Sequence, residues 1–260
     1  MSTSHCEFVW YELMTTDVQA ATRFYRNVTG WSTADSGLND RQYMIVSNGQ
    51  TGVGGVMALP TEALKMGARP GWIGYIGVVD VDAYVKNASQ AGGVVRRAAE
   101  DIPGVGRFAV MADPQGAAFV LFKGSSEQRP PQPPAGTPGM VGWHELHAGE
   151  RVNAFAFYSD LFGWTQADAI DMGPMGIYQI FKTGAEPVGG MMTKMAEMPV
   201  PMWLYYVNVD DIDAAVQRVK DSAGQVIHGP NQVPGGNWIA QCLDPQGAVF
   251  ALVGPSKPAA

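Results

Sequence analysis

The sequence has little cysteine, little charge and no long apolar run. Only Cys6 and Cys242 occur among 260 residues, without a CxxC pair, so we expect two reduced cysteines and no disulfide scaffold. Charged residues make up 16%, the formal net charge is −7, and Lys and Arg are not clustered, which argues against nucleic acid as a partner. No window reaches the roughly 18 apolar residues of a membrane span and no signal peptide is evident, so we expect a soluble, cytoplasmic protein without membrane contact.

Several motifs of well-known enzyme classes are also absent. There is no GxSxG elbow, no Walker loop and no HExxH, and no GxGxxG lies between a predicted strand and a predicted helix. What the chain does have is 32 Gly, 18 Pro and 14 Met. This composition indicates many turns and pliable apolar surfaces, which suit a protein built around a ligand cavity.

An internal repeat is the strongest signal in the sequence. WYELMTTDVQAATRFYRNVTGW, starting at Trp10, aligns with WHELHAGERVNAFAFYSDLFGW, starting at Trp143, and further matches follow in the same order, including DPQGAAF with DPQGAVF. The repeat predicts a first module over residues 1–123 and a second over residues 140–260. Clustered Pro and polar residues at 124–139 cannot continue a helix or a sheet, so this segment is the predicted linker.

Each module is itself predicted to be bipartite, because helix starts recur at Asp17, Asp80, Glu150 and Asp210, each after a predicted strand. Short strands rich in Val, Ile, Phe and Tyr follow each helix. The prediction is an α+β fold of four βαβββ units in tandem. Their curled mixed sheets keep one face free of helices, so we expect a cleft in each module.

Three features of each repeat carry a resemblance to a known family. A Phe-Tyr pair lies in the first helix, a Gly-Trp follows it, and Asp-Pro-x-Gly precedes the last strand. In this order they resemble the vicinal oxygen chelate superfamily, which contains glyoxalases, bleomycin-resistance proteins and extradiol dioxygenases. The resemblance covers nearly the whole chain and implies two glyoxalase-like modules.

The resemblance also implies a metal site whose usual ligands are missing here. Family members place His or Glu seven residues before the first acidic helix start of a module, and Glu seven residues beyond the Asp of Asp-Pro-x-Gly. Those positions hold Trp10, Val120, Trp143 and Ala251. None of these side chains offers a donor to a divalent cation, so we expect no cofactor.

Glu12 and Glu145 are the most informative polar residues, because they match between the repeats within apolar contexts. One interpretation makes them hydrogen-bond acceptors for a ligand, or general bases in catalysis. The other makes them structural, bound to backbone or to an Arg or Tyr of the facing module. His147 lies two residues beyond Glu145 on the same face of the strand, so the alternative to a cofactor-free protein is a non-standard divalent metal site at this pair.

Aromatic and methionine side chains at matched strand positions are the candidate ligand-binding residues, since flat rings lining a cleft suit a planar ligand. Ordinary core packing is the competing interpretation for each of them. The candidates are Trp10, Met14, Trp72, Trp143, His147 and Trp203.

These observations favour a metal-free protein, like the bleomycin-resistance branch, that binds a small aromatic or amphipathic molecule in an apolar cleft. The alternative is a glyoxalase-like lyase or isomerase, or a dioxygenase, that uses Glu12 or Glu145. A third class, a regulatory protein with vestigial clefts, has no positive feature in the sequence. A monomer or a homodimer is expected, because internal pairing of two modules already supplies the contact that single modules obtain by dimerising.

Overall fold

The computed structural model describes residues 6–38, 42–126 and 133–257. Each repeat folds as two βαβββ units, which confirms the predicted fold class. The elements of the first repeat are β1 (Phe8–Thr15), α1 (Val18–Thr29), β2 (Ser32–Asp35), β3 (Tyr43–Asn48), β4 (Thr51–Ala58), α2 (Thr61–Lys65), β5 (Gly71–Gly77), α3 (Val81–Gln90), β6 (Val94–Ile102), β7 (Gly106–Ala112) and β8 (Ala118–Gly124). Those of the second are β9 (Val141–Ala148), α4 (Arg151–Phe162), β10 (Thr165–Asp171), a 3-10 turn η1 (Gly173–Met175), β11 (Ile177–Lys182), β12 (Pro187–Thr193), β13 (Met202–Asn208), α5 (Ile212–Asp221), β14 (Gln225–Gln232), β15 (Trp238–Leu243) and β16 (Val249–Gly254).

Each repeat supplies one eight-stranded mixed sheet. The strand order is β2-β3-β4-β1-β5-β8-β7-β6 in the first repeat and β10-β11-β12-β9-β13-β16-β15-β14 in the second. The pairs β1–β4, β5–β8, β9–β12 and β13–β16 are parallel, and the outer pairs are antiparallel. The predicted linker 124–139 falls between the two sheets in sequence, and its residues 127–132 lie outside the described part.

Three of the four predicted helix starts are the N-cap residues of the structure. The carboxylates of Asp17, Asp80 and Glu150 accept backbone N–H groups of α1, α3 and α4, as N-caps do. The predicted start at Asp210 was wrong by one residue, since Asp211 caps α5. Two adjacent aspartates precede the same apolar face, and that face does not reveal which carboxylate turns back onto the helix.

The predicted apolar faces of α1 and α5 are buried. In α1 these are Val18, Ala21, Phe24, Tyr25 and Val28, and in α5 they are Ile212, Ala215, Val216 and Val219. α1 ends at Gly30, whose φ of +79° is the left-handed conformation that glycine adopts without strain.

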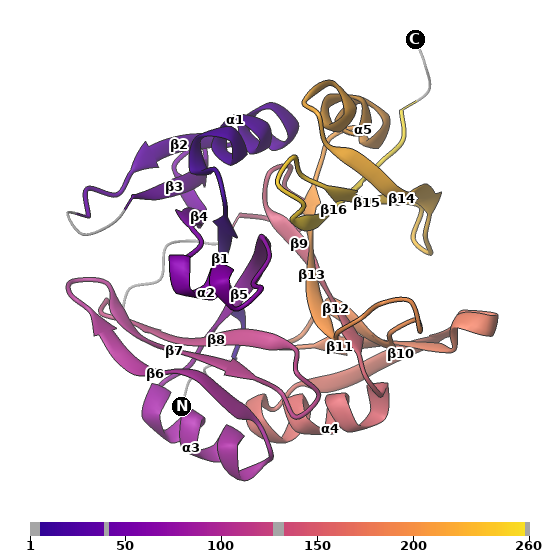
Figure 1. The fold of residues 1–260 in the computed structure, drawn as a ribbon. Coiled ribbons are helices and arrows are strands. Elements are labelled where there is room, and N and C mark those ends of the chain that lie inside the picture. Colours follow the sequence, from indigo (N-terminus) through magenta and orange to yellow (C-terminus); the bar gives the residue numbers. More distant parts are fainter. Residues whose placement is uncertain (1–5, 39–41, 127–132, 258–260) are drawn as a thin grey trace. The chain divides into compact units, whose positions relative to one another are not determined.

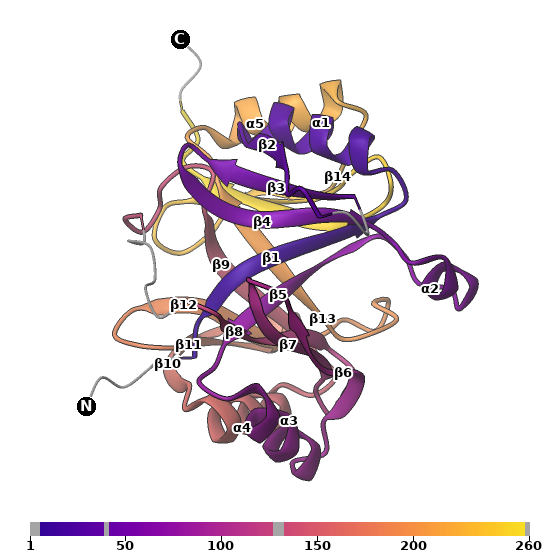
Figure 2. The same cartoon turned by 90° about the vertical axis from the view of Figure 1, so that its left-hand side faces the viewer.

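The Cα positions group into two compact units, each of which combines half of each repeat. The first unit contains Met1–Trp10, Ile73–Arg129 and Trp143–Leu204, and within it α3 and α4 lie side by side (Figures 1 and 2). The second unit contains Tyr11–Trp72, Pro130–Gly142 and Tyr205–Ala260, with α1 beside α5. Each unit therefore has its own core, built from segments far apart in the sequence.

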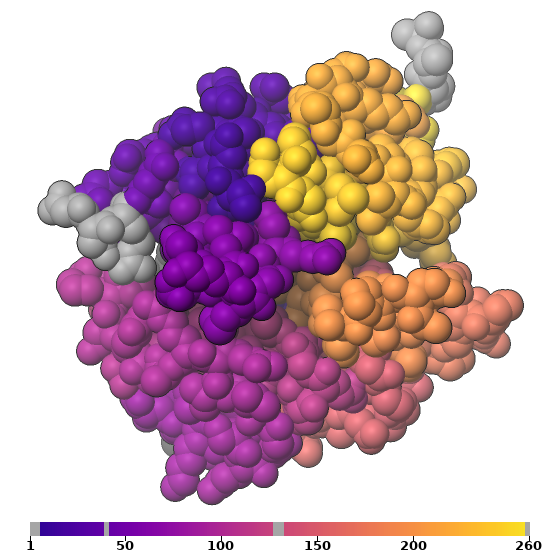
Figure 3. All heavy atoms as spheres, in the orientation of Figure 1, coloured from indigo at the N-terminus to yellow at the C-terminus, as the bar shows by residue number. Residues whose placement is uncertain are grey.

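Within the described residues both cysteines are buried and neither forms a disulfide, as predicted. The short α2 segment, in contrast, is solvent-exposed and forms a projection on the surface in Figure 3, where Met66 at its end is 83% exposed. Within the described residues, no helix is both long and apolar enough to cross a membrane.

Candidate functional site

A hydrogen-bonded network on β9 and β11 brings together three of the residues singled out in the sequence. In the first unit, the Trp143 indole Nε1 donates to the Tyr178 hydroxyl at 2.7 Å, and that hydroxyl donates to Glu145 Oε2 at 3.0 Å. His147 Nε2 lies 2.7 Å from Glu145 Oε1. The Glu145 and His147 side chains are each 9% exposed. A buried carboxylate is thus paired and hydrogen-bonded, as burial of a charge requires.

The strand registers explain how this network forms. Glu145 pairs with Gly190 and His147 with Met192 across the parallel β9–β12 ladder. A Cβ on Gly190 would overlap the Tyr178 ring, so this glycine provides the space that the ring occupies on its way to Glu145. Phe181, three residues beyond Tyr178, points to the opposite face and stacks on Trp164 after α4. The network therefore lies on the helix-free face of the sheet.

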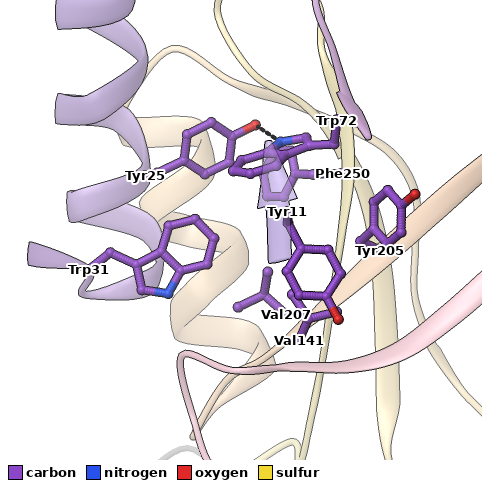
Figure 4. A pocket seen from close by; sticks show the side chains of 8 residues that line it. All are labelled: Tyr11, Tyr25, Trp31, Trp72, Val141, Tyr205, Val207 and Phe250. Carbon is purple, nitrogen blue, oxygen red and sulfur yellow. Dashed lines mark hydrogen bonds between the residues drawn. The ribbon is translucent and has the colours of Figure 1, made fainter. Parts of the chain in front are cut away.

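A small cavity in the second unit is lined by residues of both repeats. Its empty volume, which is partly open to solvent, is about 260 Å³. The lining residues are Tyr11, Tyr25, Trp31, Trp72, Val141, Tyr205, Val207 and Phe250 (Figure 4). Trp72 and Val141 are half-buried, whereas the other six are buried.

The polar groups of this cavity wall are largely engaged with protein partners. The Tyr25 hydroxyl accepts from Trp72 Nε1 at 2.8 Å, the bond drawn in Figure 4, and donates to Asp244 Oδ2 at 3.2 Å. Trp31 Nε1 donates to the carbonyl of Gly139. Burial, and then the neighbouring Tyr205, raise the pKa of Tyr11 well above its usual value. The wall therefore presents mainly ring faces and aliphatic carbon.

The same Trp-Tyr-Asp arrangement occurs in the first unit. Trp203 Nε1 donates to the Tyr158 hydroxyl at 3.0 Å, which donates to Asp113 Oδ2 at 3.1 Å. Asp113 also accepts the backbone N–H groups of Gln115 and Ala117, which closes the Asp-Pro-x-Gly turn. Burial raises the pKa of both Asp113 and Asp244. This motif ties the turn of one repeat to the first helix of the other within each unit.

Comparisons with known proteins place the chain in a family. Residues 152–252 match the model of the Glyoxalase/Bleomycin resistance protein/Dioxygenase superfamily, and residues 10–122 match a Glyoxalase-like domain. "Putative glyoxylase CFP32" of Mycobacterium tuberculosis is 34% identical over 254 residues, which cover 95% of this chain and 94% of that protein. The chain belongs to the glyoxalase/bleomycin resistance protein/dioxygenase superfamily. The resemblance stated from the sequence is thereby confirmed.

Three further proteins are similar to this chain in sequence or in fold. "Anthracycline biosynthesis protein DnrV" of Streptomyces peucetius is 32% identical over 270 residues, with 94% of this chain and 91% of that protein covered. Among solved structures, the 2,3-dioxygenase LapB of Pseudomonas sp. KL28 aligns with a TM-score of 0.66 at 12% identity, over 97% of this chain and 93% of LapB. The Mn(II)-bound glyoxalase of Novosphingobium aromaticivorans aligns with a TM-score of 0.65 at 17% identity, over 98% and 83% of the two chains. These structural likenesses show the fold.

Glyoxalases and dioxygenases of this superfamily lead one to expect a divalent metal ion, but the residues at the corresponding positions of this chain do not fit one. Val120 and Ala251 are buried core residues, and the indole of Trp143 is used in the Tyr178 hydrogen bond. Across the described residues, no group of three or more His, Cys, Asp or Glu is placed to hold a metal. Glu145 and His147 are two donors already bound to each other, fewer than zinc or calcium sites require.

The corresponding strand of the first repeat is built differently. Trp10, Glu12 and Met14 share one face of β1 and are half-buried. Met14 occupies the place of His147, so the first repeat has a carboxylate but no adjacent imidazole. Gly55 pairs with Glu12 and faces the Tyr43 ring, as Gly190 faces Tyr178.

The structure distributes the predicted ligand-binding residues over different environments. Trp72 lines the cavity of the second unit, Trp143 and His147 belong to the Glu145 network, and Trp203 is a buried core residue at 3% exposure. Sequence reasoning missed four aromatic wall residues, namely Tyr11, Tyr25, Trp31 and Phe250. Strand alternation was the available signal, because it places Tyr11 on the opposite face of β1 from Trp10.

His144 gives the fold a specific pH dependence. It is buried, stacks on Phe8 at 4.2 Å between ring centroids, and shares a 2.7 Å hydrogen bond between Nδ1 and the carbonyl of Val188. Burial lowers its pKa from 6.5 to about 4, although the Val188 bond opposes the shift. Below pH 6.5 the unfolded chain therefore binds more protons than the folded one, and stability falls.

Because of His144, we expect the free energy of unfolding to decrease by on the order of 3 kcal/mol as the pH falls from 6.5 to 4. Urea unfolding of the wild type and of His144→Phe across this pH range measures the effect. The difference in the free energy of unfolding between the two proteins should shift in favour of the variant at low pH. If the free energies of unfolding of wild type and His144→Phe change with pH in parallel, His144 does not stay neutral when buried.

Proposed function

We propose that this superfamily member binds a planar aromatic small molecule in the cavity of its second unit, without a metal ion. The observation that carries the proposal is the composition of the wall, in which six of the eight lining side chains are aromatic. Aromatic rings bind one another by stacked and edge-on contacts that need no charge and no metal. Trp72 and Val141, the half-buried wall residues, stand where a ligand would enter.

The chemistry of the wall sets the class of ligand. Because Tyr25, Trp31 and Trp72 use their polar atoms on protein partners, the cavity has little to offer a strongly polar molecule. The enclosed space is small, about that of one water molecule, so an aromatic ring enters only when wall side chains such as Trp72 move aside. An apolar ring suits this wall better than a sugar or a phosphate.

The relatives support the same ligand class. Anthracyclines contain a planar quinone fused to further rings, and the Streptomyces peucetius relative is named as an anthracycline biosynthesis protein. The superfamily also includes bleomycin resistance proteins by name. Binding of a planar aromatic compound is therefore the function that the cavity and these relatives support together.

Filling the cavity mouth tests the proposal. We expect anthraquinone-2-sulfonate, a planar compound without a hydrogen-bond donor, to bind the wild type in calorimetric titration. Val141→Phe should weaken this binding at least tenfold, about 1.4 kcal/mol, because the added ring occupies the entry. Val152→Phe makes the same change on α4, where the side chain is 55% exposed, and should leave affinity unchanged. Equal affinity in wild type and Val141→Phe would remove this cavity as the site.

A further inference from the structure

The Glu145 network, which ligand binding in the second unit does not use, has a fixed order of donors and acceptors. Trp143 Nε1–H donates to the Tyr178 oxygen, and the Tyr178 hydroxyl donates to Glu145 Oε2. Glu145 Oε2 accepts from Tyr178, and Oε1 accepts the hydrogen that we assign to His147 Nε2 in their 2.7 Å contact. In the tautomer with its hydrogen on Nε2, the other ring nitrogen, Nδ1, is a lone-pair acceptor.

This acceptor is buried and unsatisfied. His147 is 7% exposed, and its Nδ1 has no hydrogen-bond partner among the described residues. Buried polar atoms without partners are rare in folded proteins and cost roughly as much as a lost hydrogen bond. The other histidine on β9, His144, has a hydrogen-bond partner for its Nδ1, the carbonyl of Val188. Of these two Nδ1 atoms, that of His147 is the one without a hydrogen-bond partner among the described residues.

We propose that His147 Nδ1 is a binding site for a weakly acidic hydroxyl group, a phenol or an enol, of a small molecule. Glu145 positions the ring and fixes which nitrogen accepts, and Tyr178 and Trp143 hold Glu145 in place. An ether or a ketone oxygen has no hydrogen to give to Nδ1 and gains nothing there. A metal is not the expected occupant, because no third donor accompanies the pair in the described part of the chain.

Because His147 is buried, a ligand reaches its Nδ1 only when a neighbouring side chain moves aside. Met192 is paired in register with His147 and therefore lies beside it on the helix-free face. Methionine side chains are unbranched and change rotamer readily, so Met192 is suited to move aside for a ring. β12 ends one residue later, at Thr193, so His147 lies near the end of the β9–β12 ladder.

The repeat itself supplies the test variant. Met14 stands where the second repeat has His147, so His147→Met introduces a side chain that the same fold already carries at this position. We expect the wild type to bind 4-chlorophenol about five- to tenfold more tightly than 4-chloroanisole, the methyl ether that lacks the donor. His147→Met should bind the two compounds equally. His228→Met, at an exposed histidine, is the matched control and should keep the preference.

A second measurement does not depend on the variant folding. In wild-type protein labelled with ¹⁵N-histidine, 4-chlorophenol should move the Nδ1 resonance of His147 whereas 4-chloroanisole should not. The phenol preference should also survive Val141→Phe, which separates this site from the cavity of the second unit. Equal binding of phenol and ether by the wild type, a preference that persists in His147→Met, or an unmoved Nδ1 resonance at saturating phenol would each overturn the proposal.

Discussion

Replacing Asp113 with Ala should lower the free energy of unfolding by about 3 to 5 kcal/mol. The carboxylate accepts the N–H groups of Gln115 and Ala117 and the Tyr158 hydroxyl, and Asp113 is 1% exposed. Removing it leaves buried donors without partners and opens the Asp-Pro-x-Gly turn. Urea unfolding followed by circular dichroism measures the loss.

Two comparisons keep this prediction specific. Asp113→Asn retains one acceptor oxygen for the turn and should cost clearly less than Asp113→Ala. Asp168→Ala removes an exposed aspartate side chain on β10 and should stay within about 0.5 kcal/mol of the wild type. A loss below 1 kcal/mol for Asp113→Ala would show that the turn and Tyr158 do not depend on this carboxylate.

Gly189→Ala is the second substitution expected to have a large effect, about 3 kcal/mol or more. A Cβ at Gly189 would overlap the backbone carbonyl of His144 and the Phe181 ring, and neither can move without disturbing the β9–β12–β11 ladder. Thermal unfolding of the variant should report a lower midpoint.

Gly71→Ala provides the control for this substitution. Gly71 lies at the start of β5, and an added Cβ would meet no atom within 4 Å. Its stability should remain within about 0.5 kcal/mol of the wild type. If Gly189→Ala and Gly71→Ala have the same unfolding midpoint, close packing around position 189 is not the reason for its glycine.

The fold was predictable because the signals for it are local and repeated. Capping carboxylates such as Asp17, apolar helix faces and ordered matches between the repeats predicted four βαβββ units, and these are the elements observed. The start of α5 was placed one residue early, since local pattern does not choose between Asp210 and Asp211. Gly189 and Gly190 lie inside β12, where β9 and β11 pack closely against them.

The site was predictable only in part, because its contacts join residues distant in the sequence. Alternation correctly placed Trp143, Glu145 and His147 on one face of a strand. Nothing in the local sequence indicates that Tyr178 reaches Glu145, since that contact depends on the register of β11 and β12. The cavity wall was more difficult to predict than this network. Tyr11 and Tyr205 come from different repeats, and their rings are in contact only because parts of both repeats pack together in the second unit.

The most direct test of metal-free aromatic ligand binding is a calorimetric titration of metal-stripped protein with anthraquinone-2-sulfonate. The protein is dialysed against EDTA, its metal content is checked by elemental analysis, and the titration is repeated after Mn²⁺ or Zn²⁺ is added. We predict one binding event per chain with the same affinity in every case. Binding that appears only after a metal is restored would contradict the account.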